Sequence, residues 1–75
     1  MNLKRITEAQ AEKIARAHGC VRCGEYSYKR VKVTPANPAA AEEFSESWHV
    51  TLRCGVCKAE SELGLDAEGD VLYAH

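Results

Sequence analysis

The sequence predicts a small α+β domain in which an N-terminal helix packs on an antiparallel sheet of three or four strands. Three features indicate this class: a capped amphipathic segment near the N-terminus, later segments in which apolar and polar residues alternate, and four cysteines arranged as two Cys-x-x-Cys pairs. A chain of this size buries only about 60% of the surface of its unfolded form, so a covalent or metal cross-link is expected. We expect a single domain over residues 1–75, with the helix within 1–19 and the cysteine-bearing sheet within 20–75.

The segment "ITEAQAEKIARAHG" has the start and stop signals of a helix over about residues 8–18. Thr7 is a favourable N-cap, and Gln10 three positions later completes a capping-box pattern. Gly19 is the expected left-handed residue that ends the helix. The helix is expected to pack on the sheet through a narrow apolar stripe formed by alanines together with Leu3, Ile6 and Ile14.

Four later segments are typical of strands because they alternate or are rich in β-forming residues. They are "YSYKRVKVTP" at 26–35, "SWHVTLRC" at 47–54, "KAESELGLD" at 58–66 and "VLYA" at 71–74. Their order favours an antiparallel arrangement. The alanine-rich segment 35–46, between the first two strands, is compatible with either a short helix from Pro38 through Phe44 or a mobile loop.

The charge is unevenly distributed along the chain. Residues 1–35 carry eight lysines and arginines against three glutamates, whereas residues 36–75 carry two against eight acidic residues. This asymmetry indicates either a basic binding face or two halves that neutralise each other. The basic start lacks the apolar run of a signal peptide, and no segment is apolar for long enough to cross a membrane. We therefore expect a cytoplasmic protein with reduced thiols and no membrane association.

The cysteines form two pairs with identical internal spacing, Cys20 with Cys23 and Cys54 with Cys57. In a reducing compartment this spacing favours one tetrahedral Zn²⁺ site with four thiolate ligands over two disulfides or free redox-active thiols. Gly24 follows the first pair and relieves crowding in its turn. Lys58 occupies the equivalent position after the second pair, so the second turn is expected to be the less favourable one. The three histidines are not expected to be ligands, because four cysteines already complete the site; they are His18, His49 and His75.

"CVRCG" and "CGVCK" resemble the paired zinc knuckles of the zinc-ribbon family, and the resemblance covers about residues 18–74. It implies a ribbon-like sheet and one structural Zn²⁺ bound by the four cysteines, and it implies little about activity. "CVRCGEYSY" is also similar to the first iron-binding loop of rubredoxin. That resemblance implies a one-electron carrier with iron in the same site, although the second loop here lacks the proline and trailing glycine usual in rubredoxins.

Alternation along the first two strands places their valines, Trp48 and Leu52 on a core-facing side and gathers aromatic and basic residues on the other side. This combination suits single-stranded nucleic acid, because cations hold phosphates and rings stack on bases. The candidate nucleic-acid-binding residues are Tyr26, Tyr28, Arg30, Lys32, His49 and Arg53.

The same face has a second interpretation. Glu60 and Glu62 lie on the equivalent side of the next strand, where pairing with Arg53 and Arg30 would make a cross-strand charge ladder. A protein partner would then dock on the N-terminal helix or on the edge strand "VLYA". The sequence carries no Ser/His/Asp signature, phosphate-binding loop or dinucleotide fingerprint. We expect a module that binds a protein or nucleic acid, with neither catalysis nor a small-molecule substrate.

Overall fold

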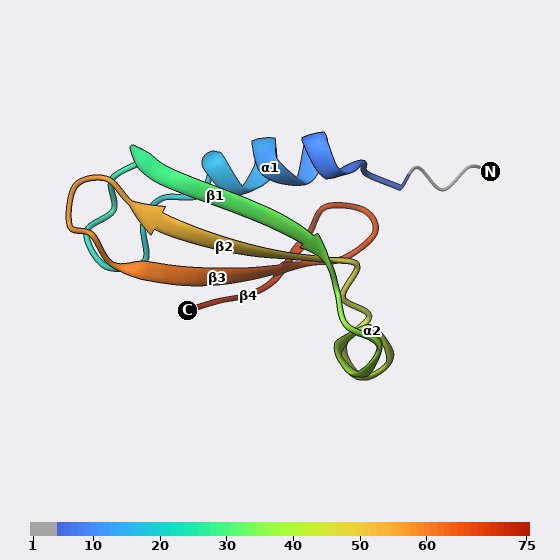
Figure 1. The fold of residues 1–75 in the computed structure, drawn as a ribbon. Helices are drawn as coiled ribbons and strands as arrows, with labels where there is room; N and C mark the ends of the chain where they lie inside the picture. Colours follow the sequence, from blue (N-terminus) through green and yellow to red (C-terminus); the bar gives the residue numbers. More distant parts are fainter. Residues whose placement is uncertain (1–4) are drawn as a thin grey trace.

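The computed structural model describes residues 5–75 and has the α+β architecture that the sequence predicts (Figure 1). Its elements are α1 (Glu8–Arg16), β1 (Tyr28–Pro35), α2 (Pro38–Phe44), β2 (Trp48–Cys54), β3 (Glu60–Leu65) and β4 (Val71–Ala74). The four strands form one antiparallel sheet in the order β1-β2-β3-β4. Helix α1 lies along one face of this sheet, and the alanine-rich segment forms the short helix α2 at the end of the sheet opposite the cysteine turns.

The predicted N-terminal cap of α1 is confirmed. The backbone N–H of Gln10 donates to Thr7 Oγ1 at 3.2 Å, and the N–H of Thr7 donates back to Gln10 Oε1 at 2.9 Å. The helix ends at Arg16 with Ala17 as a right-handed C-cap. The expectation that Gly19 adopts the left-handed conformation is wrong. Gly19 instead lets the backbone of the cysteine turn lie close to the end of the helix, because a Cβ at this position would lie 3.1 Å from the carbonyl oxygen of Gly24.

The core lies between α1 and the face of the sheet that α1 covers. Register places Val33, Val50 and Leu63 opposite one another, so these side chains share a face, and Val31 is opposite Leu52. Helix α1 contributes two alanines that are fully buried, and their small side chains let it approach the sheet closely. Among the described residues, the buried apolar cluster consists of Ala11, Ala15, Val50, Leu52, Leu63 and Leu65, and Ile6 and Ile14 pack against it. Leu3 lies outside the described residues.

A β-bulge near the start of β1 reverses the expected orientation of one aromatic residue. The register shifts between Tyr28, which is opposite Cys54, and Arg30, which is opposite Arg53. Strict alternation would put Tyr28 on the same side as Arg30, but the extra residue turns it to the other side. Tyr28 packs against the core, and its hydroxyl donates a hydrogen bond to the carbonyl oxygen of His18. The prediction that Tyr28 belongs to the open binding face is therefore wrong.

The sheet face opposite α1, which we call the open face, is not covered by a helix, and Gly64 lies near its centre. Gly64 on β3 is directly opposite both His49 on β2 and Tyr73 on β4. A Cβ at Gly64 would lie only 2.3 Å from Tyr73 Cε2, so the tyrosine ring occupies the space above β3 where a side chain would otherwise stand. The absence of that side chain lets Tyr73 reach across β3 toward β2.

Gly64→Ala is expected to destabilise the folded protein by about 1–3 kcal/mol, because the new methyl group displaces the Tyr73 ring. Alanine is otherwise favoured over glycine in a strand interior, so a loss of stability would point to the contact with the Tyr73 ring. Urea unfolding of the metal-loaded protein measures it. The same substitution in a Tyr73→Ala background is the control, and a penalty that persists there would contradict the ring clash as its cause.

Candidate metal centre

Two turns from distant parts of the chain carry the four cysteines to one end of the molecule. Cys20 and Cys23 lie between α1 and β1, whereas Cys54 ends β2 and Cys57 follows in the turn before β3 (Figure 1). Each turn is closed by its own backbone bond, from Cys20 N–H to Glu25 O at 2.8 Å and from Cys54 N–H to the carbonyl of residue 59 at 2.9 Å. The N–H of residue 55 also donates to the carbonyl of residue 27 at 2.7 Å, which ties the second turn to the strand-entry segment after the first.

The four sulfur atoms have the spacing of a tetrahedral metal site. All four lie within 4.8 Å of one another, and the pairs Cys20–Cys57 and Cys23–Cys54 are each separated by 3.6 Å. Four Zn–S bonds of about 2.3 Å in tetrahedral geometry place the sulfurs about 3.8 Å apart. A disulfide requires about 2.05 Å, so these thiols are not paired covalently. The residues present therefore fit a four-thiolate metal ion.

Backbone N–H groups aimed at the sulfurs favour their ionised form. The N–H of Arg22 lies 3.3 Å from Cys20 Sγ, and those of Val56 and Cys57 lie 3.3 and 3.4 Å from Cys54 Sγ. The backbone N–H groups of Cys23 and then Arg22 lower the pKa of Cys20 to about 6. The N–H groups of Cys57 and Val56 likewise lower the pKa of Cys54. One cysteine of each pair thus ionises more readily than an ordinary thiol.

The Cys23 sulfur shows why a cation belongs at the centre. The backbone N–H of Glu25 lowers the pKa of Cys23, but loss of solvent and the three neighbouring sulfurs outweigh it and raise the pKa to about 12. Four thiolates this close repel one another, so protein groups alone do not ionise them all. A divalent cation removes that repulsion and deprotonates a coordinating thiol. The donor set is suited to a metal ion.

The two turns differ in backbone strain. Gly24, after the first pair, has φ of 79°, and a Cβ there would meet no atom within 4 Å. Lys58 occupies the matching place after the second pair with φ of 66°, in the left-handed region that disfavours residues with side chains. The sequence-based expectation that the second turn is the less favourable one is confirmed at Lys58.

Lys58→Gly is expected to stabilise the folded protein by about 0.5–1 kcal/mol, because relief of the left-handed strain exceeds the entropy that glycine adds to the unfolded chain. The matched control is Gly24→Ala, which should destabilise by about 1 kcal/mol through backbone strain alone. Urea unfolding at a fixed free metal concentration compares the two. A destabilised Lys58→Gly protein would contradict this description of the turn.

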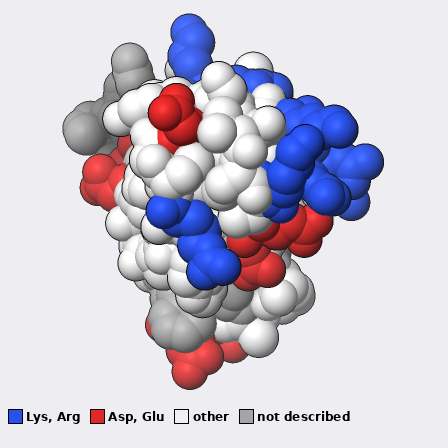
Figure 2. Space-filling model, turned by 90° about the vertical axis from the view of Figure 1, so that its left-hand side faces the viewer, with Lys and Arg blue, Asp and Glu red and all other residues white. Residues whose placement is uncertain are grey.

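The basic residues of the predicted binding face are only partly brought together. Arg30, Lys32 and Arg53 share the open face of β1 and β2, and Arg30 is directly opposite Arg53. Tyr26 lies outside the strands, between the first cysteine turn and β1, and its ring is exposed. Lys29, Arg30 and Arg53 line a hollow of about 390 Å³. Figure 2 looks onto the end of the molecule that carries the cysteine turns, which we call the metal end. Lysine and arginine side chains gather on one side of this view, with acidic groups beside them.

The expected charge ladder forms in part. Arg53 Nη1 lies 3.6 Å from Glu60 Oε2 across β2 and β3. Glu62 does not pair with Arg30; its Oε1 lies 3.8 Å from His49 Nε2 and 3.9 Å from His75 Nε2. Within residues 5–75, Arg30 has no ion pair. The acidic side chains of β3 therefore offset part of the positive charge of β2, and they make no ion pair with the basic side chains of β1.

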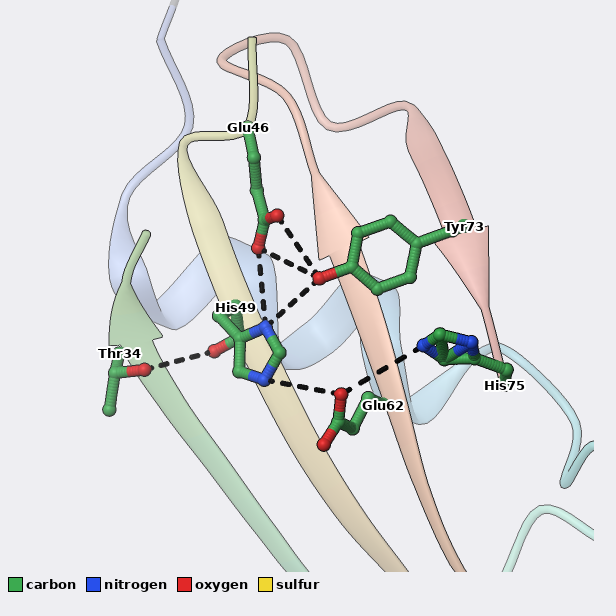
Figure 3. Close-up of polar contacts among 6 residues, drawn as sticks. All are labelled: Thr34, Glu46, His49, Glu62, Tyr73 and His75. Atoms are coloured by element: carbon green, nitrogen blue, oxygen red, sulfur yellow. Dashed lines mark hydrogen bonds and ion pairs between the residues drawn. The ribbon is translucent and has the colours of Figure 1, made fainter. Parts of the chain in front are cut away.

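Sequence reasoning missed a buried polar cluster on the open face (Figure 3). The Glu46 side chain is only 1% exposed, and its carboxylate accepts hydrogen bonds from the Tyr73 hydroxyl at 3.0 and 3.2 Å. His49 Nδ1 lies 3.2 Å from Glu46 Oε2 and 3.1 Å from the Tyr73 oxygen. Burial and then the nearby Glu46 raise the pKa of Tyr73 to about 12, so this hydroxyl keeps its proton. Only the three-dimensional pairing distinguishes Glu46 from the exposed glutamates beside it in the sequence.

Among residues 5–75, no helix is both long and apolar enough to span a membrane. No family model, curated protein or solved structure matches the chain. The assignment therefore rests on the geometry described above: a small α+β domain with a four-cysteine cluster suited to a metal ion.

Proposed function

We propose that this chain is a zinc ribbon in which Cys20, Cys23, Cys54 and Cys57 bind one structural Zn²⁺. The observation that supports this most strongly is the convergence of four sulfurs from two turns within 4.8 Å. Four protein thiolates fill every position of a tetrahedral ion and leave none for water or substrate. Such a closed site serves stability, and the proposed role of the protein is binding in the reducing cytoplasm, with no catalytic step at the four-thiolate ion.

The ion would stabilise a domain whose core is thin. The buried apolar cluster involves only α1, β2 and β3 among the described elements, with β1 and β4 packed at its sides. Metal coordination links the turn before β1 to the turn after β2, and so closes a long loop. Because an unfolded chain does not hold a preformed site, the free energy of metal binding becomes free energy of folding.

Removal of the metal with a strong chelator is expected to unfold the domain, and Cys23→Ser is expected to prevent stable metal binding. Metal analysis and the dispersion of the ¹H–¹⁵N NMR spectrum measure both effects. His18→Gln changes a neighbouring potential ligand outside the cluster and is the control. A Cys23→Ser protein that retained stoichiometric zinc and native dispersion would contradict the four-thiolate site.

The same measurements separate zinc from the rubredoxin-like alternative. Four thiolates also bind iron, and an iron site would give a coloured protein with a reversible one-electron couple. Our proposal predicts a colourless protein that contains one equivalent of zinc. Stoichiometric iron in the protein as isolated from iron- and zinc-replete cells would favour the electron-transfer alternative.

The basic side near the metal end is the best candidate for the binding surface. Arg30 and Arg53 face each other across β1 and β2, and only Arg53 has an acidic partner, Glu60. An anion bound beside Arg30 would offset the repulsion between the two like charges. The hollow they share with Lys29 is large enough for a phosphate group. The exposed ring of Tyr26 in the adjoining turn offers a stacking surface. We propose single-stranded nucleic acid as the partner, with a protein partner as the alternative.

A titration of the zinc-loaded protein with a short single-stranded oligonucleotide is expected to shift the amide signals of Lys29, Arg30 and Arg53. The affinity should fall steeply with salt, because each phosphate contact releases counterions. Arg30→Gln should weaken binding severalfold and reduce the salt slope by about one. Arg16→Gln is the control, because Arg16 lies on α1 and pairs with Glu12.

A spectrum that stayed unchanged throughout the titration would contradict nucleic-acid binding. Attention would then move to the exposed apolar side chains that suit a protein partner. These are Val21 and Val56 on the cysteine turns, and Val71 and Leu72 on the edge strand β4.

A further inference from the structure

The β-bulge at the start of β1 brings three cationic side chains to one hollow at the metal end. The register passes from Tyr28 directly to Arg30, so Lys29 is the extra residue and is opposite no described residue of β2. In a regular strand, Lys29 and Arg30 would point to opposite faces of the sheet. With the bulge, both side chains are exposed, and together with Arg53 they line the hollow of about 390 Å³.

The second cysteine turn packs directly against this bulge. The N–H of Gly55 donates to the carbonyl oxygen of Ser27 at 2.7 Å. A Cβ at Gly55 would lie 3.0 Å from that oxygen and 3.6 Å from the backbone nitrogen of Lys29. The absence of a side chain at Gly55 therefore lets the turn lie close to the bulged segment. The position of Lys29 thus depends on the same turn that carries two of the cysteines.

The hollow has an excess of two positive charges. Arg53 Nη1 lies 3.6 Å from Glu60 Oε2, so one of the three cations has an acidic partner. Among residues 5–75, neither Lys29 nor Arg30 forms an ion pair. Three cations and the single carboxylate of Glu60 leave a balance of +2. A ligand that carries two negative charges on one group would neutralise this balance.

A phosphate monoester has that charge, whereas a phosphodiester inside a strand does not. A monoester carries a charge of about −1.5 to −2 at pH 7 and offers three terminal oxygens as acceptors. Each phosphodiester of a nucleic acid carries one negative charge and has only two such oxygens. A guanidinium binds two phosphate oxygens at once as a planar fork, and an ammonium binds as a point charge. Two arginines and one lysine around one hollow therefore match a monoester better than a diester.

We propose that the hollow lined by Lys29, Arg30 and Arg53 binds the terminal phosphate monoester of a single-stranded nucleic acid, so that the protein recognises a phosphorylated strand end. This inference rests on the proposed nucleic-acid-binding function and names the part of the strand that the site selects. The exposed ring of Tyr26, in the segment that leads into β1, is available to stack on the terminal base. Internal phosphates would follow β1 toward Lys32, on the same face as Arg30.

The test measures the affinity of the zinc-loaded, full-length protein for three versions of one short oligothymidine by calorimetry at fixed salt. One version has a 5′-phosphate, one has a 3′-phosphate, and one has hydroxyl groups at both ends. One of the phosphorylated versions is expected to bind at least about tenfold more tightly than the hydroxyl version, because it adds charge-assisted hydrogen bonds to the hollow.

Substitutions in the hollow should remove this preference. Lys29→Gln and Arg30→Gln are each expected to bring the ratio of the two affinities from about tenfold toward one, because each removes one of the unpaired cations. Lys32→Gln is the matched control, because Lys32 is an exposed cation of the same strand that lies outside the hollow. It should weaken the binding of all three oligonucleotides alike and leave the ratio unchanged.

Equal affinities for the three oligonucleotides would overturn the terminal-phosphate inference and leave nucleic-acid binding by the open face intact. A preference that survived both Lys29→Gln and Arg30→Gln would overturn the assignment of the hollow. If none of the oligonucleotides binds, the proposed function fails, and this inference fails with it. Binding of a phosphoserine peptide in that case would show that the hollow takes its phosphate from a protein instead.

Discussion

The meeting of two cysteine turns at one end of the sheet is the constraint on which the rest of the structure depends. Cys20 and Cys54, one from each turn, are buried where the core ends, and their partners Cys23 and Cys57 lie outside them. This junction holds the end of α1 against the start of β1 and the end of β2. In a domain with so small an apolar core, a metal ion bound at this position would supply stability that a larger protein gains from burial.

The two faces have different physical roles. The face under α1 holds the apolar core, and its alternating valines and leucines have no polar function. The open face changes in charge across the sheet, from the free cations of β1 to the acidic side chains of β3. The ion pair of Arg53 with Glu60 marks the boundary between these two regions. An anionic partner therefore suits the β1 side of this face better than the β3 side.

Local patterns in the sequence predicted the features that depend on neighbours along the chain. The capping box at Thr7, the core-facing residues Val50 and Leu52, and the paired cysteines each follow from spacing alone. The orientation of Tyr28 did not, because a single bulged residue reverses alternation without leaving a sign in the sequence. The role of Glu46 depends on Tyr73, 27 positions away. Such a contact exists only once β2, β3 and β4 are in register and the Tyr73 ring lies over Gly64.

X-ray absorption at the metal edge of the protein as isolated tests the central claim most directly, because it identifies the element and its donor atoms together. The proposed zinc site predicts a zinc edge and a first shell of four sulfurs at about 2.3 Å. An iron edge would contradict the assignment of zinc. A first shell with fewer than four sulfurs, or a metal-free protein with disulfides that is nevertheless folded, would contradict the four-thiolate centre and the dependence of the fold on it.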